Sequence, residues 1–317
     1  MLKTPCNAIA GFLGSGKTTL LRNSLEKVFQ EKRVAIIMNE IGDLGIDGKV
    51  VSGFENIDKV VELNSGCVCC SVDIFSLHNA FREIQEQIKP DLIVIETTGL
   101  ANPFPLIQRL HYLDVVLDSV ITLVDASEFL RLAAEEEVLN EQVRAADFLI
   151  LNKTDLVTEL EIEQVESHLR QLNQRAPLFK TTHSNIDPKL LFALGANLYR
   201  RQSKLLETQV TKSAQGFRDS HQDFSSFSYQ TERLVNLDKF KQFLGELSQK
   251  VYRAKGILNL DDRATSCLFN FICGRFDFQV VAPEICGKMP TQAVFIGRNL
   301  EQEQTAIIQQ LQACQDG

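Results

Sequence analysis

The sequence lacks any uninterrupted run of about 18 apolar residues, so no segment is expected to cross a membrane as a helix. It also lacks an excess of basic residues, because 33 lysines and arginines stand against 41 aspartates and glutamates, for a net charge of −8. General binders of nucleic acid or of anionic membranes need basic surface, so we expect neither partner. The first apolar stretch is too short for a signal peptide, and we expect a cytoplasmic protein.

Internal repeats and low-complexity tracts are also missing, and the composition, 44% apolar and 23% charged, is that of a globular protein. At 317 residues the chain is long enough for one large domain or two ordinary ones. Its eight cysteines, without a secretory signal, are expected to stay reduced. Five of them are scattered among apolar neighbours and are expected to be small buried hydrophobic residues: Cys6, Cys267, Cys273, Cys286 and Cys314.

Through the first two hundred residues, short apolar runs alternate with amphipathic stretches, which predicts an α/β domain with a mostly parallel sheet flanked by helices. We expect this domain to span residues 1–200, followed by a polar linker over 201–223 and a small α+β domain over 224–317. Strands are predicted at 7–11, 33–39, 60–64, 91–96, 119–125 and 147–153, and helices at 17–30, 73–88, 127–144 and 158–174. The second domain is predicted to contain a strand at 224–230, a helix at 236–252, further strands within 254–297 and a helix near 301–314.

The segment GFLGSGKT, residues 11–18, matches the P-loop pattern G-x-x-x-x-G-K-[ST] between an apolar strand and a helical stretch. Glycines let the backbone wrap around phosphate oxygens, with N–H groups and the helix N-terminus directed at them. We expect Lys17 to hold the β- and γ-phosphates and the Thr18 hydroxyl to bind Mg²⁺. The predicted nucleotide contacts in this loop are Gly11, Gly14, Ser15, Gly16, Lys17, Thr18 and Thr19.

A second acidic residue is expected at the end of another strand of the same sheet. ETTG, residues 96–99, closes a buried apolar run in that way. Glu96 is predicted to orient the Mg²⁺ shell or the attacking water, and the Gly99 N–H to sense the γ-phosphate. Lys17, Thr18, Glu96 and Gly99 are therefore the predicted catalytic residues.

The tetrapeptide NKTD, residues 152–155, ends a further strand and indicates the base that is bound. The Asp155 carboxylate can accept hydrogen bonds from N1–H and the 2-amino group of guanine, which adenine does not offer. Asn152 is expected to meet the O6 edge and brace the loop, while the Lys153 stem packs along the base. The alternative is a simple helix N-cap. With the phosphate loop upstream, the sequence predicts GTP and GDP as ligands.

Three cysteines, Cys67, Cys69 and Cys70, fall within four positions in NSGCVCCSVD, directly after the predicted strand VVELN. Three thiolates this close can hold one soft or borderline divalent ion such as Zn²⁺, with a fourth position left for another ligand or a recipient protein. If the strands are parallel, these thiols and the γ-phosphate share one edge of the sheet. Two alternatives stay open, namely three buried structural cysteines and a disulfide-based redox switch.

Together the segments GFLGSGKTTLL, NEIGDLGID, LNSGCVCC, ETTGLANP and NKTD resemble the CobW-like GTPases in content and order, over about 145 residues. The C-terminal part resembles the family's C-terminal domain more weakly. The resemblance implies a GTPase of the SIMIBI class that loads a divalent metal, most often zinc, and hands it to a client metalloprotein. Its C-x-C-C thiols correspond to Cys67, Cys69 and Cys70, and Glu40 to an accessory metal ligand or switch element.

One departure from the family is the absence of a histidine-rich stretch near the domain junction, where only His221 is found. This departure argues against a large metal-buffering capacity. We expect GTP and Mg²⁺ to order the segments after Asn39 and around Glu96, and hydrolysis to release that order and permit metal transfer. The sequence leaves open a GTP-gated thiol redox sensor without metal delivery, cobalt or iron in place of zinc, and a homodimer.

Overall fold

The computed structural model describes residues 3–27, 33–38, 57–62, 74–192, 224–261, 265–281 and 290–315. The chain divides into two compact units, Met1–Ala196 and Asn197–Gly317. The predicted linker, residues 201–223, lies outside the described residues. None of the described helices is both long enough and apolar enough to span a membrane.

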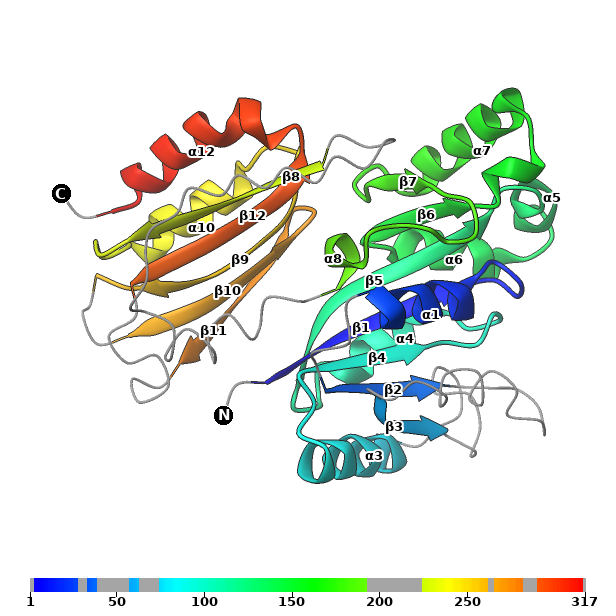
Figure 1. The fold of residues 1–317 in the computed structure, drawn as a ribbon, viewed down its shortest axis with the longest axis horizontal. Helices are drawn as coiled ribbons and strands as arrows, with labels where there is room; N and C mark the ends of the chain where they lie inside the picture. Colours follow the sequence, from blue (N-terminus) through cyan, green and yellow to red (C-terminus); the bar gives the residue numbers. More distant parts are fainter. Residues whose placement is uncertain are drawn as a thin grey trace. The chain divides into compact units, whose positions relative to one another are not determined.

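The first unit is built on a seven-stranded sheet in the order β3-β2-β4-β1-β5-β6-β7, with every neighbouring pair parallel (Figure 1). Strands β1, β2, β4 and β6 are buried almost throughout, because a parallel sheet carries helices on both faces. All their carboxyl ends meet at one edge. The strands are β1 (Thr4–Gly11), β2 (Val34–Met38), β3 (Ile57–Glu62), β4 (Leu92–Glu96), β5 (Val115–Asp125), β6 (Phe148–Asn152) and β7 (Leu178–Lys180).

Two clusters of buried apolar residues fill the space between one sheet face and its helices. One joins the central strands to α3 and α4, and the other joins β5 and β6 to α5, α6 and α7. The helices in the described part of this unit are α1 (Lys17–Lys27), α3 (Ile74–Gln87), α4 (Pro103–Leu110), α5 (Phe129–Ala133), α6 (Glu137–Ala145), α7 (Glu159–Leu172) and α8 (Pro188–Leu191), with a 3₁₀ turn η2 (Thr154–Leu156).

The predicted helix over 127–144 is two helices, α5 and α6, with a break at Ala134–Glu136. Glu136 takes an extended backbone, and the Asn140 side chain donates to the carbonyl of Ala133 at the end of α5. The bond satisfies a terminal carbonyl of α5, which lets each short helix turn its own apolar face to the sheet.

Helix α4 was absent from the sequence prediction although a start signal is present. The Asn102 side chain accepts a hydrogen bond from the Phe104 N–H, and Pro103 occupies the first helical position. Asparagine at the N-cap followed by proline is a recognised helix start.

The second unit is an antiparallel five-stranded sheet in the order β11-β10-β9-β12-β8, with two helices among its described residues (Figure 1). Burial alternates along β10 and β12, as expected when only one sheet face is covered. The predicted helix over 236–252 ends at Gly245, and the β-forming run from Val251 becomes a strand instead. The elements are β8 (Phe224–Thr231), α10 (Leu237–Gly245), β9 (Val251–Asn259), β10 (Ser266–Ile272), β11 (Arg275–Val281), β12 (Thr291–Arg298) and α12 (Leu300–Ala313).

Candidate functional site

The glycine-rich loop lies between the end of β1 and the start of α1, so it sits at the carboxyl edge of the sheet. Gly14 has φ +73° and open space around its Cα, and Gly16 has φ +107°. A Cβ at Gly16 would lie 2.5 Å from Nδ2 of Asn152 and 2.7 Å from Oγ of Ser184, so only glycine fits there. The backbone at Gly16 is therefore closely packed against Asn152 and Ser184, whereas the backbone at Gly14 has open space beside it.

Lys17 and Thr18, the first residues of α1, are held in place by polar contacts. The buried Lys17 ammonium donates to the carbonyls of Gly11, at 2.9 Å, and Phe12, at 3.1 Å. The Thr18 hydroxyl donates to Oε1 of Glu96 at 3.0 Å. Glu96 ends β4 and is only 7% exposed, so the contact joins the start of α1 to the carboxyl end of β4, the strand next to β1. The predicted catalytic residues Lys17, Thr18 and Glu96 thus converge on one place.

The loop after β4 runs against the glycine-rich loop. The Thr97 N–H donates to the Ile9 carbonyl of β1 at 2.9 Å. Two residues further on, Gly99 is so close that a Cβ would lie 2.5 Å from the backbone nitrogen of Leu13. A side chain at position 99 would push the two loops apart. Gly99 therefore contacts the glycine-rich loop at Leu13, and its role toward the γ-phosphate stays a prediction.

Asn152, at the end of β6, braces the glycine-rich loop. Its Nδ2 donates to the Ser15 carbonyl at 2.9 Å and to Oγ of Ser184 at 3.0 Å. Its Oδ1 accepts from the Ser184 N–H at 2.8 Å and from the Thr181 hydroxyl at 3.1 Å. All four hydrogen bonds that an asparagine amide can form therefore go to protein groups. A contact with guanine O6 would require one of them to open.

Lys153 has a left-handed backbone, with φ 63°, and its ammonium lies 2.6 Å from a carboxylate oxygen of Asp125. Asp125 ends β5, and its second oxygen accepts from the N–H and hydroxyl of Ser127. The pair fixes the direction of the Lys153 stem. Asp155 lies in η2 and is exposed, so its carboxylate is accessible to a base. Asp125 was not predicted from the sequence, although it is a polar residue that ends a buried strand, as Glu96 and Asn152 are.

The loop after β7 is a second part of the site that the sequence did not single out. His183 and Ser184 both have φ 53°, which is strained backbone for residues other than glycine. The Asn23 amide of α1 donates to the His183 carbonyl, and the Ser184 hydroxyl donates to the Gly16 carbonyl. These contacts hold the loop against the glycine-rich loop and the start of α1. No short sequence motif indicates this role, because the role depends on contacts between residues that are far apart in the sequence.

The predicted metal site lies outside the described residues, as do Cys67, Cys69, Cys70, Asn39, Glu40 and His221. Within the described ranges, no three His, Cys, Asp or Glu side chains gather as a metal site. Cys6, Cys267 and Cys314 are buried as expected, and burial raises the pKa of the Cys6 thiol. Cys273 is half-buried in the turn between β10 and β11, which corrects the expectation of full burial, and Cys286 lies outside the described residues.

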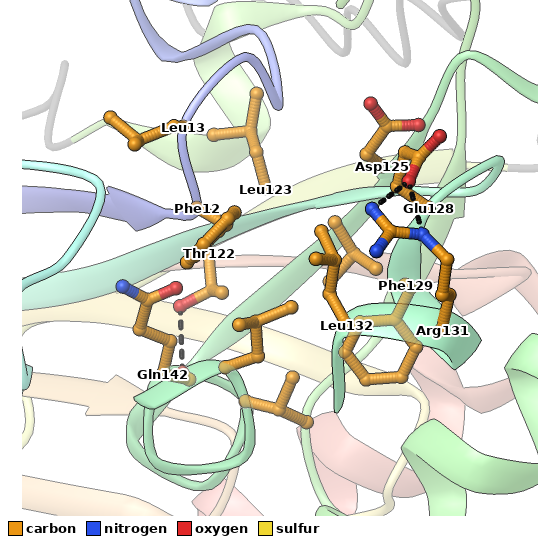
Figure 2. A pocket seen from close by; sticks show the side chains of 13 residues that line it. Phe12, Leu13, Thr122, Leu123, Asp125, Glu128, Phe129, Arg131, Leu132 and Gln142 are labelled. Carbon is orange, nitrogen blue, oxygen red and sulfur yellow. Dashed lines mark hydrogen bonds and ion pairs between the residues drawn. The ribbon is translucent and has the colours of Figure 1, made fainter. Parts of the chain in front are cut away.

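A pocket of about 240 Å³ opens beside the tip of the glycine-rich loop. Figure 2 shows Phe12 and Leu13 at one side of it, with Glu128 and Arg131 at the other. Its wall includes Thr122 of β5 and Gln142 of α6, and the Thr122 hydroxyl donates to the Gln142 carbonyl at 2.9 Å. The pocket therefore adjoins both the glycine-rich loop and α6.

The parallel sheet, the glycine-rich loop after β1 and the Lys17–Thr18 start of α1 define a P-loop nucleoside-triphosphatase fold. The chain belongs to the CobW/HypB/UreG family. Residues 5–180 match the family's nucleotide-binding domain, and residues 224–315 match the C-terminal domain of the cobalamin synthesis protein CobW.

Several known proteins are similar to this chain over most of its length. The zinc chaperone YjiA of Escherichia coli is 31% identical over 93% of this chain and 94% of its own length. The zinc-regulated GTPase metalloprotein activator 1 of Schizosaccharomyces pombe is 32% identical over 81% of this chain and 72% of its own. Among solved structures, the Zn(II)-bound YjiA GTPase of E. coli is 27% identical, with full coverage of both chains and a TM-score of 0.46.

Proposed function

We propose that this chain is a GTP-hydrolysing metallochaperone that binds zinc through Cys67, Cys69 and Cys70 and transfers it to a client metalloprotein in step with its GTP state. Family membership supports nucleotide binding, and two relatives named as GTPases support hydrolysis. Relatives named as zinc chaperones support zinc as the cargo. A cytoplasmic location agrees with the sequence-based expectation of reduced thiols.

The observation that carries the hydrolytic part is the contact between Thr18 and Glu96. A hydroxyl at the start of α1 and a carboxylate at the end of β4, 3.0 Å apart, are the kind of oxygen ligands that Mg²⁺ prefers. Thr18 would bind the ion directly and Glu96 would orient its water shell. Bound Mg²⁺ supplies positive charge that neutralises phosphate oxygens during hydrolysis. Lys17 adds a fixed cation next to the same oxygens, and its contacts with Gly11 and Phe12 hold that charge without reorganisation.

Guanine selection is assigned to the ends of β5 and β6. The exposed Asp155 carboxylate would accept two hydrogen bonds from guanine, and Lys153, held by Asp125, would lay its stem along the ring. Asn152 acts through the loops that it joins, because its own hydrogen bonds tie Ser15 to the segment after β7. An adenine base would leave the Asp155 carboxylate unpaired, so GTP is preferred over ATP.

Chain length and strand order are compatible with a metal site near the phosphates. Cys67 lies five residues beyond Glu62, where β3 ends, which limits its distance from that end to about 17 Å. Strand β3 is three places from β1 in the sheet, or about 14 Å. Both strands end at the same edge, since the sheet is parallel. Chain length and topology therefore allow the thiols to approach the nucleotide, with Glu40 as an accessory ligand.

The experiment compares wild type, the triple variant with Cys67, Cys69 and Cys70 changed to serine, and Lys17→Ala. Each is titrated with Zn²⁺ in competition with a fluorescent zinc chelator, in the presence of GDP or a non-hydrolysable GTP analogue. Wild-type zinc affinity should differ between the two nucleotides by about tenfold, a common size for coupling between sites. The triple variant should lose tight zinc binding and keep hydrolysis. Lys17→Ala should keep zinc and lose hydrolysis by at least about 100-fold.

The matched control is Cys273→Ser, which removes a half-buried cysteine of the second unit and should leave zinc affinity unchanged. Zinc affinity that ignores the nucleotide would contradict the proposal and favour the redox sensor, as would tight zinc binding by the triple variant. Normal hydrolysis by Lys17→Ala would contradict the assigned phosphate loop.

A further inference from the structure

We infer that Gln142 of α6 is a positioning residue for GTP hydrolysis, because it fixes the loop that follows Glu96 and contains Gly99. The inference rests on the proposed function and names a residue that supports the same site. Gln142 lies outside every motif found in the sequence. It is a polar residue on the buried face of an amphipathic helix, and it is 1% exposed.

The Gln142 amide joins α6 to the loop after β4. Its Nε2 donates to the carbonyls of Gly99 and Ala101, both at 3.0 Å. Its own backbone carbonyl accepts the bond from Thr122, which ties this turn of α6 to β5 (Figure 2). The backbone and side chain of this one buried residue therefore connect the central sheet, α6 and the loop next to the predicted γ-phosphate position.

The same loop is anchored on its other side by β1. The Thr97 N–H and hydroxyl both donate to the Ile9 carbonyl, at 2.9 and 3.2 Å. Between this anchor and the Gln142 anchor lie Thr98 and the peptide N–H of Gly99. The direction of this N–H is therefore set by two fixed parts of the loop, namely Thr97 before it, bonded to β1, and the carbonyls after it, bonded to Gln142. An active-site group displaced by about 1 Å can cost about 100-fold in rate, so an anchor at this place affects catalysis.

If Gln142 had a purely structural role, replacing it would lower stability without a specific loss of hydrolysis. Another buried amide of this unit provides a matched control for that alternative. Asn173, which follows α7, is also a buried amide that bridges two carbonyls, those of Val143 at 2.8 Å and Ala146 at 2.9 Å. It holds the C-terminal end of the same helix, α6. Its side chain bonds to Val143, Ala146, Arg175 and Ala176, and not to the loop after β4 or to the glycine-rich loop. Replacing Asn173 thus loosens α6 without releasing Gly99.

The experiment compares Gln142→Met and Asn173→Leu, two changes that keep approximate shape and remove the amide. Steady-state GTP hydrolysis, affinity for fluorescent GDP and thermal unfolding are measured for both full-length variants. We expect Gln142→Met to lower kcat by about 10- to 100-fold, since the catalytic loop loses one anchor. Its GDP affinity should stay within about twofold, because GDP lacks the γ-phosphate. Asn173→Leu should lower Tm and leave kcat within about threefold.

A kcat for Gln142→Met equal to that of wild type, or an equal loss in both variants, would overturn the inference. A loss of GDP affinity with unchanged kcat would also overturn it. If Gln142→Met does not fold, Thr122→Val removes only the bond that buttresses Gln142 and should lower kcat by about 3- to 10-fold; wild-type kcat in that variant would count against the inference. Wild type without GTPase activity, or Lys17→Ala with full activity, would instead refute the proposed function.

Discussion

The two units of this protein bury different kinds of side chain. The nucleotide-binding unit covers its sheet on both faces and still encloses many polar groups, among them Lys17, Glu96, Gln142 and Asn152. In the second unit, the buried polar residues within the described ranges are Arg253, Thr291 and Gln315. Its core is apolar and rich in phenylalanine, with the rings of Phe240 and Phe269 in edge contact at 4.9 Å.

The difference shows that this chain buries polar groups mainly in the nucleotide-binding unit. A buried polar group is unfavourable unless it is hydrogen-bonded, so each must have a specific partner. In the first unit those partners join loops at the carboxyl ends of the strands, as Asn152 joins Ser15 to Ser184. Among the described residues of the second unit fewer polar side chains are buried, and its large apolar core makes packing the main source of its stability. The first unit therefore carries the site, and we expect changes in the second to act mainly on stability.

The largest expected effect is the loss of stability when the apolar core of the second unit is disrupted. Phe295 is fully buried and stacks on Phe227, with ring centroids 5.0 Å apart. Phe295→Ala should destabilise this unit by about 3–5 kcal/mol, because it removes a large buried side chain and leaves a cavity. Denaturant unfolding measures the loss. Phe276→Ala, at a ring that is 36% exposed, should cost less than about 1 kcal/mol. A matching fall in GTP hydrolysis by folded Phe295→Ala protein would break the comparison between the units.

A change at the proposed guanine-binding residues, directly after β6, should alter the preference for GTP over ATP and leave the free energy of unfolding unchanged. If Asp155 accepts the two charge-assisted hydrogen bonds from guanine that we propose, Asp155→Ala should lower GTP affinity by about 100-fold and leave ATP affinity unchanged. Competition with a fluorescent guanine nucleotide measures it. Asp114→Ala, an exposed carboxylate at the opposite end of β5, is the control and should bind GTP normally. Equal losses in both variants would indicate a general charge effect and not recognition of the base.

The smallest expected effect concerns the start of α7. The backbone N–H and the hydroxyl of Thr158 bond to Glu161 and hold the pKa of that carboxyl below its usual range. A lowered folded-state pKa gives stability that is present above the unfolded pKa, about 4.3, and lost as pH falls through the folded value. Thr158→Ala should cost about 1 kcal/mol at neutral pH. The difference between wild type and Glu161→Gln should shrink below about pH 4 in urea unfolding. A pH-independent difference would exclude this linkage.

Several features of the site followed from the sequence because they depend on local pattern. Strand, glycine loop and helix come in direct succession at residues 4–27, and Glu96 and Asn152 end short, continuously apolar runs whose length is typical of buried strands. The errors lie where tertiary contacts override local preference. The break between α5 and α6 depends on Asn140, and the early end of α10 at Gly245 frees Val251 to pair with the sheet.

The order of motifs along the chain, by itself, determined the nucleotide-binding class, the parallel sheet and the family, because each motif is a short stretch whose chemistry depends on its neighbours in sequence. Only the tertiary structure decided which distant side chains support the site. Gln142 and Ser184 reach it from α6 and from the loop after β7, and Asp125 reaches it from β5. Such contacts join residues far apart in sequence, and their hydrogen bonds form only when the sheet has brought those segments together.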